Sequence, residues 1–435
     1  TRYISVTGVQ TCALPISFVC AALLQTTGCF RVSRDHLYDG PPPRPEAMER
    51  YYAPEHSYQA YREEIETATK KYTIKHITMD SYAGPIVIDY FQTPKQSDSL
   101  VLVFPVLGGK NFIERHMAKY FAEAGFDAAI VNRSNEFKDP SKFDQLEEIF
   151  RLNVIRDRLA LDFFQNEYGK ARFGTFGISR GAINVALTAG IDERLKYNVL
   201  VMGGTDLVDL FRDSNQPRIA KYIQLVSEQK GFSHEQFFEA LRQQLRTDPN
   251  NTARYLDGRD TLLILGIFDR TVPFRYGLKL REQIGRPETV FLLADHYVGV
   301  LYSQTVSVLP PSKDGPGLFP LPYVEEEALN FYDRHFNDET HWTIVPYRIL
   351  QAPVNLLAEG FAEIGSFFEW AFDGDEEPNR EEDEETESEQ YWTDALQIAA
   401  GDSPEDAEGI ALYRAEDSLP ITAPGTVSAP VADKQ

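Results

Sequence analysis

Apolar and polar positions alternate in two short segments near residue 80, and continuous apolar runs recur at intervals after them. Alternation is typical of a strand with one buried face, and a short apolar run is typical of a central strand in a parallel sheet. The segments with these patterns are residues 72–79, 86–92, 100–106, 127–132, 172–178, 197–204, 261–268 and 289–294. They predict a sheet of eight strands.

Stretches with apolar residues at helical spacing separate most of these strands. They cover residues 113–124, 144–168, 180–189, 274–283 and 323–335. Two hairpin-like strands followed by repeated strand–helix units predict an α/β fold, in which helices flank a mostly parallel, doubly wound sheet. A length of 435 residues allows one large domain with additions.

One connection in this predicted domain is much longer than the others. Residues 206–260 lie between two strands and contain three stretches with helical spacing: 206–213, 218–229 and 234–246. We expect a helical cap insertion there, placed to act as a lid that shapes a pocket and excludes water.

The first 70 residues do not continue the pattern. Residues 1–16 resemble the translation of a sequencing-library adapter, and we expect them to be an artefact without fold information. Residues 17–29 resemble the end of a bacterial lipoprotein signal, which predicts an extracytoplasmic protein anchored to the membrane through Cys29. The alternative is a short buried helix in a cytoplasmic protein. Residues 30–70 indicate a linker and then an N-terminal helix over 46–70.

Two further segments follow the predicted domain at 71–340. Residues 341–372 place apolar side chains on one helical face, so we expect an amphipathic extension that packs on the domain, with dimerisation or a membrane surface as the alternatives. Residues 373–435 hold 19 of the 66 acidic residues and 3 of the 43 basic ones, and they predict a disordered, solvated tail in which residues 391–400 are a candidate docking motif.

Charge and cysteine content exclude several kinds of chemistry. A net charge of −23 argues against nucleic acid as a partner, because such binding depends on neutralising phosphates. Of these 23 charges, 16 belong to the tail, so the predicted domain is only mildly acidic. The cysteines are Cys12, Cys20 and Cys29, so nothing after Cys29 acts as a thiol nucleophile or binds zinc through sulfur.

A G-x-S-x-G motif stands where a predicted strand ends and a predicted helix begins. It spans residues 177–181 and centres on Ser179. Alone the motif is weak, because a serine flanked by glycines arises easily by chance. At a strand-to-helix turn it gains meaning: the serine is strained and exposed there, and larger flanking side chains would collide with neighbouring elements. Ser179 is therefore a candidate nucleophile.

A serine hydroxyl needs a base, and that base needs a carboxylate to orient it. His296 follows the strand at 289–294, whereas His335 and His341 fall on a helix and in a polar turn. Asp269 follows the strand at 261–268, and the distance to His296 just accommodates one helix and one strand. We predict a Ser179–His296–Asp269 triad, with Asp206 as the alternative acid.

Together the motifs "GISRG", "IFDRTVP" and "ADHYVG" make the chain resemble the α/β-hydrolase superfamily, and in particular its esterases, lipases and dienelactone hydrolases. The resemblance covers residues 72–337. It implies the α/β-hydrolase fold and catalysis through an acyl-enzyme, with no cofactor and no metal.

The resemblance also implies an oxyanion hole built from two amides. One is the amide of Arg180, directly after the nucleophile. The other belongs to the loop after the third strand, where many relatives have a His-Gly-x-Gly run and this chain has Pro105–Gly109 instead. By position Leu107 supplies the second amide, and the departure puts its register in doubt by one residue. The alternative for Gly108–Gly109 is a plain flexible turn.

The expected reaction is hydrolysis of a carboxylic ester, with a small-molecule or lipid-like acyl substrate. A peptidase or a thioesterase would use the same three residues, and a non-catalytic binding protein would use the same fold. The side chain of Arg180 stands at a helix N-terminus, where a cation opposes the helix dipole. We expect it to point to solvent or to pair with a carboxylate, with an acidic substrate group as the alternative partner.

Overall fold

The computed structural model describes residues 32, 34–106, 112–296, 323–341, 344, 348, 353, 355–360 and 391–392. The chain divides into two units. The larger contains Thr1–Arg44 and Tyr52–Pro378, and the smaller contains Pro45–Tyr51 and Asn379–Gln435. In the smaller unit the short helix α2 (Glu46–Tyr51) places the ring of Tyr51 5.6 Å from that of Trp392.

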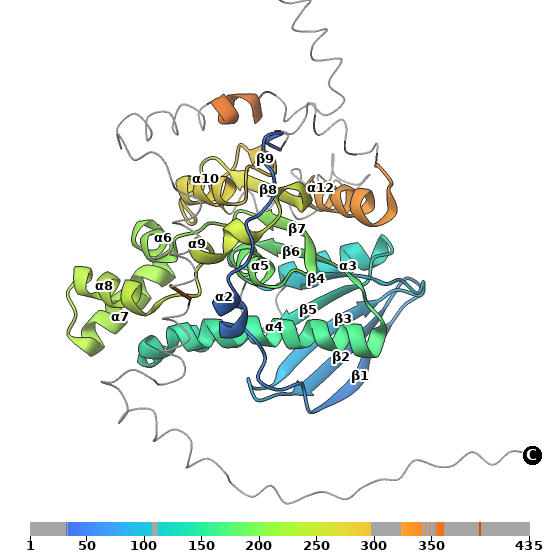
Figure 1. Ribbon diagram of the computed structural model, residues 1–435, viewed down its shortest axis with the longest axis horizontal. Helices are drawn as coiled ribbons and strands as arrows, with labels where there is room; N and C mark the ends of the chain where they lie inside the picture. The colour runs from blue at the N-terminus through green and yellow to red at the C-terminus, as the bar shows by residue number, and fades with distance from the viewer. Residues whose placement is uncertain are drawn as a thin grey trace, which may run out of the picture. The chain divides into compact units, whose positions relative to one another are not determined.

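A single mixed sheet forms the centre of the larger unit (Figure 1). Its strands are β1 (Ala60–Ala68), β2 (Thr73–Asp80), β3 (Ile86–Gln92), β4 (Ser99–Phe104), β5 (Ala128–Asn132), β6 (Arg172–Ile178), β7 (Leu195–Val201), β8 (Thr261–Gly266) and β9 (Glu288–Leu292). They are ordered β1-β2-β3-β5-β4-β6-β7-β8-β9. The pairings from β1 to β5 are antiparallel, and those from β5 through β4 to β9 are parallel.

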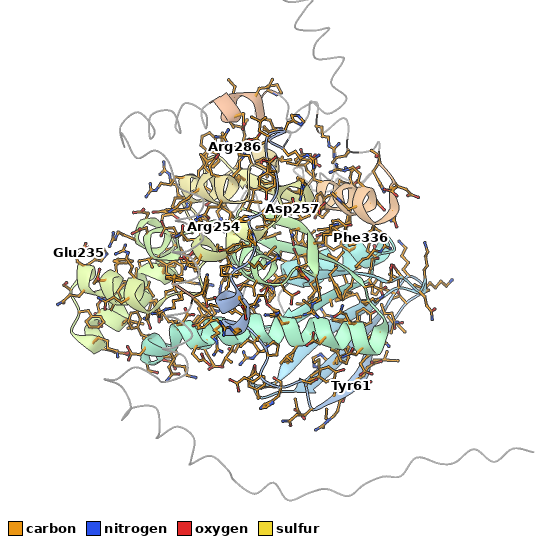
Figure 2. The ribbon with its side chains drawn as sticks, in the orientation of Figure 1. Tyr61, Glu235, Arg254, Asp257, Arg286 and Phe336 are labelled. Carbon is orange, nitrogen blue, oxygen red and sulfur yellow. The ribbon has the colours of Figure 1, made fainter. Side chains whose placement is uncertain are left out.

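All eight predicted strands are present, and β1 is a ninth that the sequence did not predict. It lies in the segment 46–70, which was predicted to be a helix, and only Glu46–Tyr51 of that segment is helical. Every residue of β1 is exposed, and Figure 2 shows Tyr61 at this free edge of the sheet. The strand has no buried face to reveal it. Instead it is held by its backbone ladder to β2 and by ion pairs such as Glu63–Lys75, at 2.7 Å.

Helices cover both faces of the sheet. They are α3 (Phe112–Glu123), α4 (Leu146–Tyr168), α5 (Arg180–Ile191), α10 (Phe274–Gln283) and α12 (Tyr323–Tyr332), which continues into η5 (Asp333–Asn337). Successive residues of a strand point to opposite faces. In β4, Leu100 and Leu102 therefore pack with α4, α5 and α10, and Val101 and Val103 pack with α3 and α12. Burial on both faces explains why the central strands are continuous apolar runs.

The insertion between β7 and β8 is helical, as predicted. Its elements are α6 (Leu207–Asp213), α7 (Pro217–Lys230), α8 (His234–Gln244), α9 (Pro249–Thr252), η3 (Ala253–Tyr255) and η4 (Gly258–Asp260). Helix α8 begins at a capping box, in which Ser233 and Gln236 satisfy each other's backbone amides. Phe237 of α8 packs on Phe143 of η2 (Pro140–Gln145), with ring centroids 5.2 Å apart.

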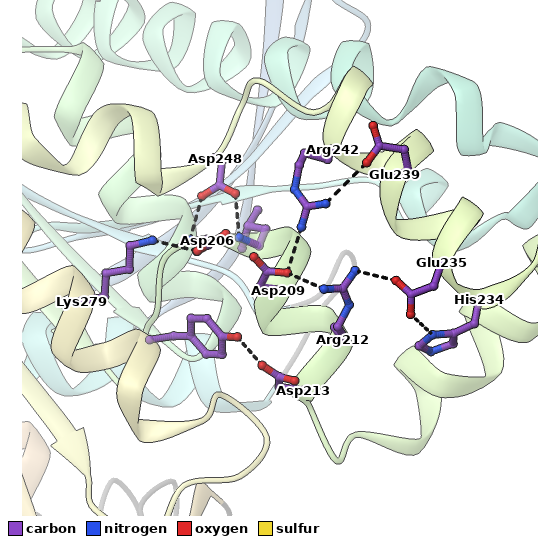
Figure 3. Close-up of polar contacts among 12 residues, drawn as sticks. Asp206, Asp209, Arg212, Asp213, His234, Glu235, Glu239, Arg242, Asp248 and Lys279 are labelled. Atoms are coloured by element: carbon purple, nitrogen blue, oxygen red, sulfur yellow. Dashed lines mark hydrogen bonds and ion pairs between the residues drawn. The ribbon is translucent and has the colours of Figure 1, made fainter. Parts of the chain in front are cut away.

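One buried carboxylate joins the beginning of the insertion to its end. Asp248, near the end, accepts hydrogen bonds from the amides of Asp206 (3.1 Å) and Leu207 (2.6 Å), where α6 begins (Figure 3). It also accepts the amide of Asn250 at 2.8 Å, at the start of α9. Burial raises the pKa of Asp248 to about 6, so the group is ionised at neutral pH and is a strong acceptor for all three amides.

The adapter-like segment, the lipoprotein-like segment with Cys29, and nearly all of the acidic tail lie outside the described residues, and the extension at 341–372 is described only at a few positions. Within the described part of the chain, no helix combines the length and the apolar character that crossing a membrane requires.

We expect Asp248→Ala to destabilise the protein by about 2 to 3 kcal/mol, because three amides lose a buried charged acceptor. Chemical denaturation followed by fluorescence measures the change. Asp209→Ala is the matched control: Asp209 pairs with Arg212 and Arg242 at the surface of the same insertion (Figure 3). Its loss should cost less than about 1 kcal/mol. Equal effects of the two substitutions would contradict the role given to Asp248.

Candidate active site

Ser179 stands alone between strand β6 and helix α5, on a turn with unusual backbone geometry. Its φ of 57° and ψ of −122° lie in a region that L residues rarely adopt. Such a conformation costs about 1 to 3 kcal/mol and persists only where the surroundings enforce it. Here the Ser179 amide donates to the carbonyl of Val201 in β7 at 2.7 Å, and helix α5 is buried from Gly181 to Ile191. The turn thus holds the serine at the edge of the sheet.

Both glycines of the motif are required by space. A Cβ atom at Gly177 would lie 2.3 Å from the carbonyl carbon of Gly181, on the far side of the turn. A Cβ atom at Gly181 would lie 2.4 Å from the carbonyl oxygen of Phe104, the last residue of β4. In both cases the clash is with backbone, which cannot rotate away. The motif in this chain is therefore a steric requirement of the turn.

Asp269 and His296 come together after the ends of β8 and β9. The Nδ1 atom of His296 lies 2.7 Å from Oδ2 of Asp269, and both side chains are buried. The second carboxylate oxygen, Oδ1, accepts the amides of Thr271 and Val272, each at 2.9 Å. A carboxylate only accepts hydrogen bonds, so Nδ1 carries the proton and Nε2 is left to accept another. The pair is thereby fixed in position and in tautomer.

Ser179 and His296 line the same cavity, which has a volume of about 900 Å³. The parallel strands β6, β8 and β9 end at one edge of the sheet, and this edge is where open α/β sheets bind their ligands. Asp269 is not part of the lining and sits behind His296. The structure therefore brings the predicted histidine and aspartate into contact and places the predicted serine on the cavity that this histidine faces.

The alternative residues have other partners. Asp206, the alternative acid, has φ 60° at the start of α6, and its carboxylate pairs with Lys279 at 2.8 Å (Figure 3). His335 stacks near Tyr197, with ring centroids 4.8 Å apart. His341 lies 2.5 Å from Asp333. Within the described ranges, none of these three residues has a recorded contact with Asp269 or His296.

The α/β-hydrolase fold combines a serine on a strained strand-to-helix turn with an acid and a histidine that follow later strands. This chain has the same order: Ser179 between β6 and α5, then Asp269 after β8 and His296 after β9. The chain has the α/β-hydrolase fold. The cap helices α6, α7 and α8 add lining residues to the cavity in this hydrolase fold, among them Leu207, Tyr222 and Phe237.

No family model and no curated protein matches the sequence. Solved structures with some likeness include an acetyl xylan esterase from Paenibacillus sp. R4, at 18% identity and a TM-score of 0.46, over 57% of this chain and 86% of that chain. Acetyl xylan esterase 1 from Thermoanaerobacterium sp. JW/SL YS485 has 14% identity and a TM-score of 0.44, over 64% of this chain and 92% of that chain. Pyrococcus horikoshii acylaminoacyl peptidase has 13% identity and a TM-score of 0.44, over 62% of this chain and 43% of that chain. Strand order and the turn at Ser179 identify the hydrolase fold without these likenesses.

Of the two predicted oxyanion donors, the structure describes Arg180 but not Leu107. The amide of Arg180 is the first of helix α5, where amides have no intrahelical acceptor and meet the positive end of the helix dipole. Leu107 lies outside the described residues. The neighbouring Val106 lines the cavity, and its amide donates to Oε1 of the buried Glu114 at 2.5 Å. Glu114, on α3, is a residue that the sequence did not single out, and it fixes the start of this loop.

The side chain of Arg180 pairs with no carboxylate among the residues that the structure describes, and it is not simply directed into solvent. Its guanidinium carbon lies 3.3 Å from the centroid of the Phe137 ring and 5.8 Å from that of Phe150. Burial, together with the nearby cation of Arg133, lowers the pKa of Arg180 to about 9, so the group is still charged at neutral pH. The expected carboxylate partner is absent among the described residues, and the buried Asp157 pairs with Arg133.

One cluster of metal-type ligands occurs in the described part of the chain. Asp333, Glu339 and His341 come close enough to share an ion. The 2.5 Å contact between Asp333 and His341 already engages two of the three groups with each other. Neither Ser179 nor the Asp269–His296 pair takes part in this cluster.

We expect Gly181→Ala to destabilise the protein by about 3 kcal/mol, because the new methyl group meets the backbone of β4. The midpoint of urea unfolding, at unchanged slope, measures the loss. Gly360→Ala is the control, since a Cβ there meets nothing within 4 Å and its φ is ordinary; it should change stability by less than about 0.5 kcal/mol. A Gly181→Ala protein as stable as the wild type would mean that the turn is looser than described.

Proposed function

We propose that the protein is a serine hydrolase in which Ser179 is the nucleophile, His296 the general base and acid, and Asp269 the orienting carboxylate. The observation that carries the proposal is the buried 2.7 Å bond between His296 and Asp269 at the wall of the cavity that Ser179 also lines. The strained backbone of Ser179 supports it, since strain of this size is kept where function requires it.

In the first half of the proposed reaction, the hydroxyl oxygen of Ser179 attacks the substrate carbonyl and its proton passes to Nε2 of His296. Asp269 stabilises the imidazolium that forms. The negative charge on the carbonyl oxygen is met by the amide of Arg180 and by a second amide, proposed to be that of Leu107. When the tetrahedral intermediate collapses, the leaving group takes the proton from His296 and an acyl-enzyme remains.

In the second half, water replaces the leaving group. His296 accepts a proton from the water, which attacks the acyl carbon and regenerates the same kind of tetrahedral intermediate. The intermediate collapses, and the carboxylic acid departs as the proton returns to the oxygen of Ser179. Both halves use one base, which Asp269 keeps in a single tautomer through its bond to Nδ1.

We propose a carboxylic ester as the bond that is cleaved. The cavity walls are mainly apolar, which suits an acyl chain or an apolar alcohol. Peptides are commonly held by backbone pairing along a free strand edge. The edge strands of the described sheet are β1 and β9, and neither supplies a lining residue. The walls instead come from helices and from loops after strands.

Ser179→Ala should abolish labelling by a fluorophosphonate probe and lower the hydrolysis of 4-nitrophenyl esters by at least about a thousandfold, because the covalent step is lost. Gel fluorescence and absorbance assays measure the two effects. Ser141→Ala, which alters an exposed serine bonded to Asp139, is the control and should label like the wild type. Labelling of the Ser179→Ala protein would refute the nucleophile; a wild type that neither labels nor hydrolyses any ester would support binding without catalysis.

Asp269→Asn should keep the local shape but lose the tautomer control of His296, and kcat should fall by about a thousandfold or more with little change in KM. Steady-state kinetics with a 4-nitrophenyl ester separates the two constants. Asp206→Asn is the matched control, because Asp206 pairs with Lys279 and not with His296. The proposal predicts a change of less than about twofold there. A larger loss in Asp206→Asn than in Asp269→Asn would move the acid to Asp206.

A further inference from the structure

The charged side chains that line the cavity beside Ser179 are all positive among the described residues. Five cationic side chains line it, and no described lining residue is an aspartate or a glutamate. The cations are Arg133, Lys138, Arg180, Arg218 and Lys221. This is unexpected in a chain with 66 acidic and 43 basic residues. Local charge in the cavity therefore runs opposite to the charge of the chain.

Four of the five cations are not neutralised within the described part of the chain. Arg133 is paired with Asp157, and both are buried. Lys138, Arg180, Arg218 and Lys221 form no ion pair with any residue that the structure describes. Arg180 lies deepest of these and is half-buried, while the other three are exposed at the mouth of the cavity. A ligand that enters therefore passes three solvated cations before it reaches a partly desolvated one.

Arg180 and Lys138 flank the same aromatic ring. The guanidinium of Arg180 lies over one side of Phe137, and Nζ of Lys138 lies 5.5 Å from the centroid of that ring. Burial lowers the pKa of Lys138, and the nearby charges of Arg180 and Arg218 lower it further. Lys138 is thus close enough to both arginines to be repelled by them, although the three cations come from η1 (Glu136–Lys138), α5 and α7.

Two helix N-termini add to this positive potential. Arg180 is the first residue of α5 and Arg218 is the second of α7, and neither helix has an acidic residue in its first turn. The N-terminal end of a helix favours anions and disfavours cations. The protein therefore places cations where its own backbone repels them, and the first turns of these two helices hold no carboxylate in compensation. Such an arrangement is unfavourable without a ligand and is relieved by an anion.

Apolar side chains form most of the remaining wall. They include Leu146, Phe150, Ile183, Leu187, Phe211 and Tyr222. A simple inorganic anion would leave this surface and most of the 900 Å³ volume unfilled. The ligand that matches the lining has an apolar body and one anionic group.

We propose that the ester cleaved at Ser179 carries an anionic group, a carboxylate or a phosphate, on an apolar body, and that Arg180, Lys138 and Arg218 bind this group. The inference rests on the proposed function, because it names the substrate class of the same site. Arg180 then has two separate parts: its amide faces the reacting oxygen, and its side chain binds a group that does not react. The side chain's acidic partner, missing from the described residues, is supplied by the substrate.

The first experiment compares two esters whose acyl chains have the same number of carbons: 4-nitrophenyl octanoate, which ends in a methyl group, and the mono-4-nitrophenyl ester of octanedioic acid, which ends in a free carboxylate. We expect kcat/KM to be at least about tenfold higher for the anionic ester. The preference should shrink as salt is added, because the cations at the mouth are exposed to screening. A second pair compares a neutral phenyl ester with one that carries a carboxylate or a phosphate on the phenol. This pair reports whether the anion belongs to the acyl or the alcohol part of the substrate. Preference for the neutral ester in both pairs would overturn the inference.

Charge-removing variants test which cations are responsible. Arg180→Gln, Lys138→Gln and Arg218→Gln should each lower the ratio of anionic to neutral kcat/KM by about threefold or more. Lys196→Gln removes the same charge at the amino end of β7, away from the carboxyl ends where the cavity lies. It is the control and should leave the ratio unchanged. If Lys196→Gln lowers the ratio as much as Arg180→Gln does, the effect is one of net charge and the inference is wrong.

A binding measurement separates this inference from the proposed reaction. Calorimetric titration of the Ser179→Ala protein with decanoate should show binding that Arg180→Gln weakens by about threefold or more, and decanol should bind more weakly than decanoate. Decanoate binding with no esterase activity or probe labelling in the wild type would refute the hydrolase and keep the anion site. Ester hydrolysis without decanoate binding or anion preference would keep the hydrolase and refute the anion site.

Discussion

Helix α5 begins so close to the end of strand β4 that the turn before it has room for only one kind of backbone. A Cβ at Gly181 would come within 2.4 Å of the carbonyl oxygen of Phe104, and one at Gly177 within 2.3 Å of Gly181 itself. This contact bends the chain sharply and forces Ser179 into a strained conformation at the edge of the sheet. The parallel order of the strands then brings the ends of β8 and β9 to the same edge, where Asp269 and His296 meet.

Much of this framework could be predicted from the sequence, because burial leaves a pattern. The central strands are buried on both faces and show as apolar runs, so all eight were found at their positions. Strand β1 could not be found in this way. Its residues are all exposed, and its stability comes from the ladder to β2 and from ion pairs such as Glu63–Lys75, which form only after the chain has folded. A Tyr- and Glu-rich segment with no buried face does not distinguish an edge strand from an exposed helix.

The candidate site likewise has one part that the sequence pattern predicts and one part that depends on contacts formed only in the folded chain. Asp269 and His296 were predictable because each follows a strand, and strand ends can be located from sequence. The surroundings of Arg180 were not predictable. Its contact with Phe137 joins two elements more than forty residues apart, and the carboxylate expected beside it is absent from the described residues. The cationic lining of the cavity was not predictable either, because charge counted along the sequence located the acidic tail but did not show which side chains the fold gathers around the cavity.

The positive potential at the cavity has two consequences for the proposed reaction that must be kept apart. A cation that binds a remote anionic group does so equally in the ground state and the transition state, so it lowers KM without raising kcat. We propose that Lys138 and Arg218, which are exposed at the mouth, act in this way. In the proposed reaction, the amide of Arg180 meets a charge that exists only after Ser179 has attacked, so its proposed effect is on kcat. Because the amide and the guanidinium belong to one residue at the start of α5, the contact between Gly181 and β4 positions both, and one steric constraint serves binding and chemistry together.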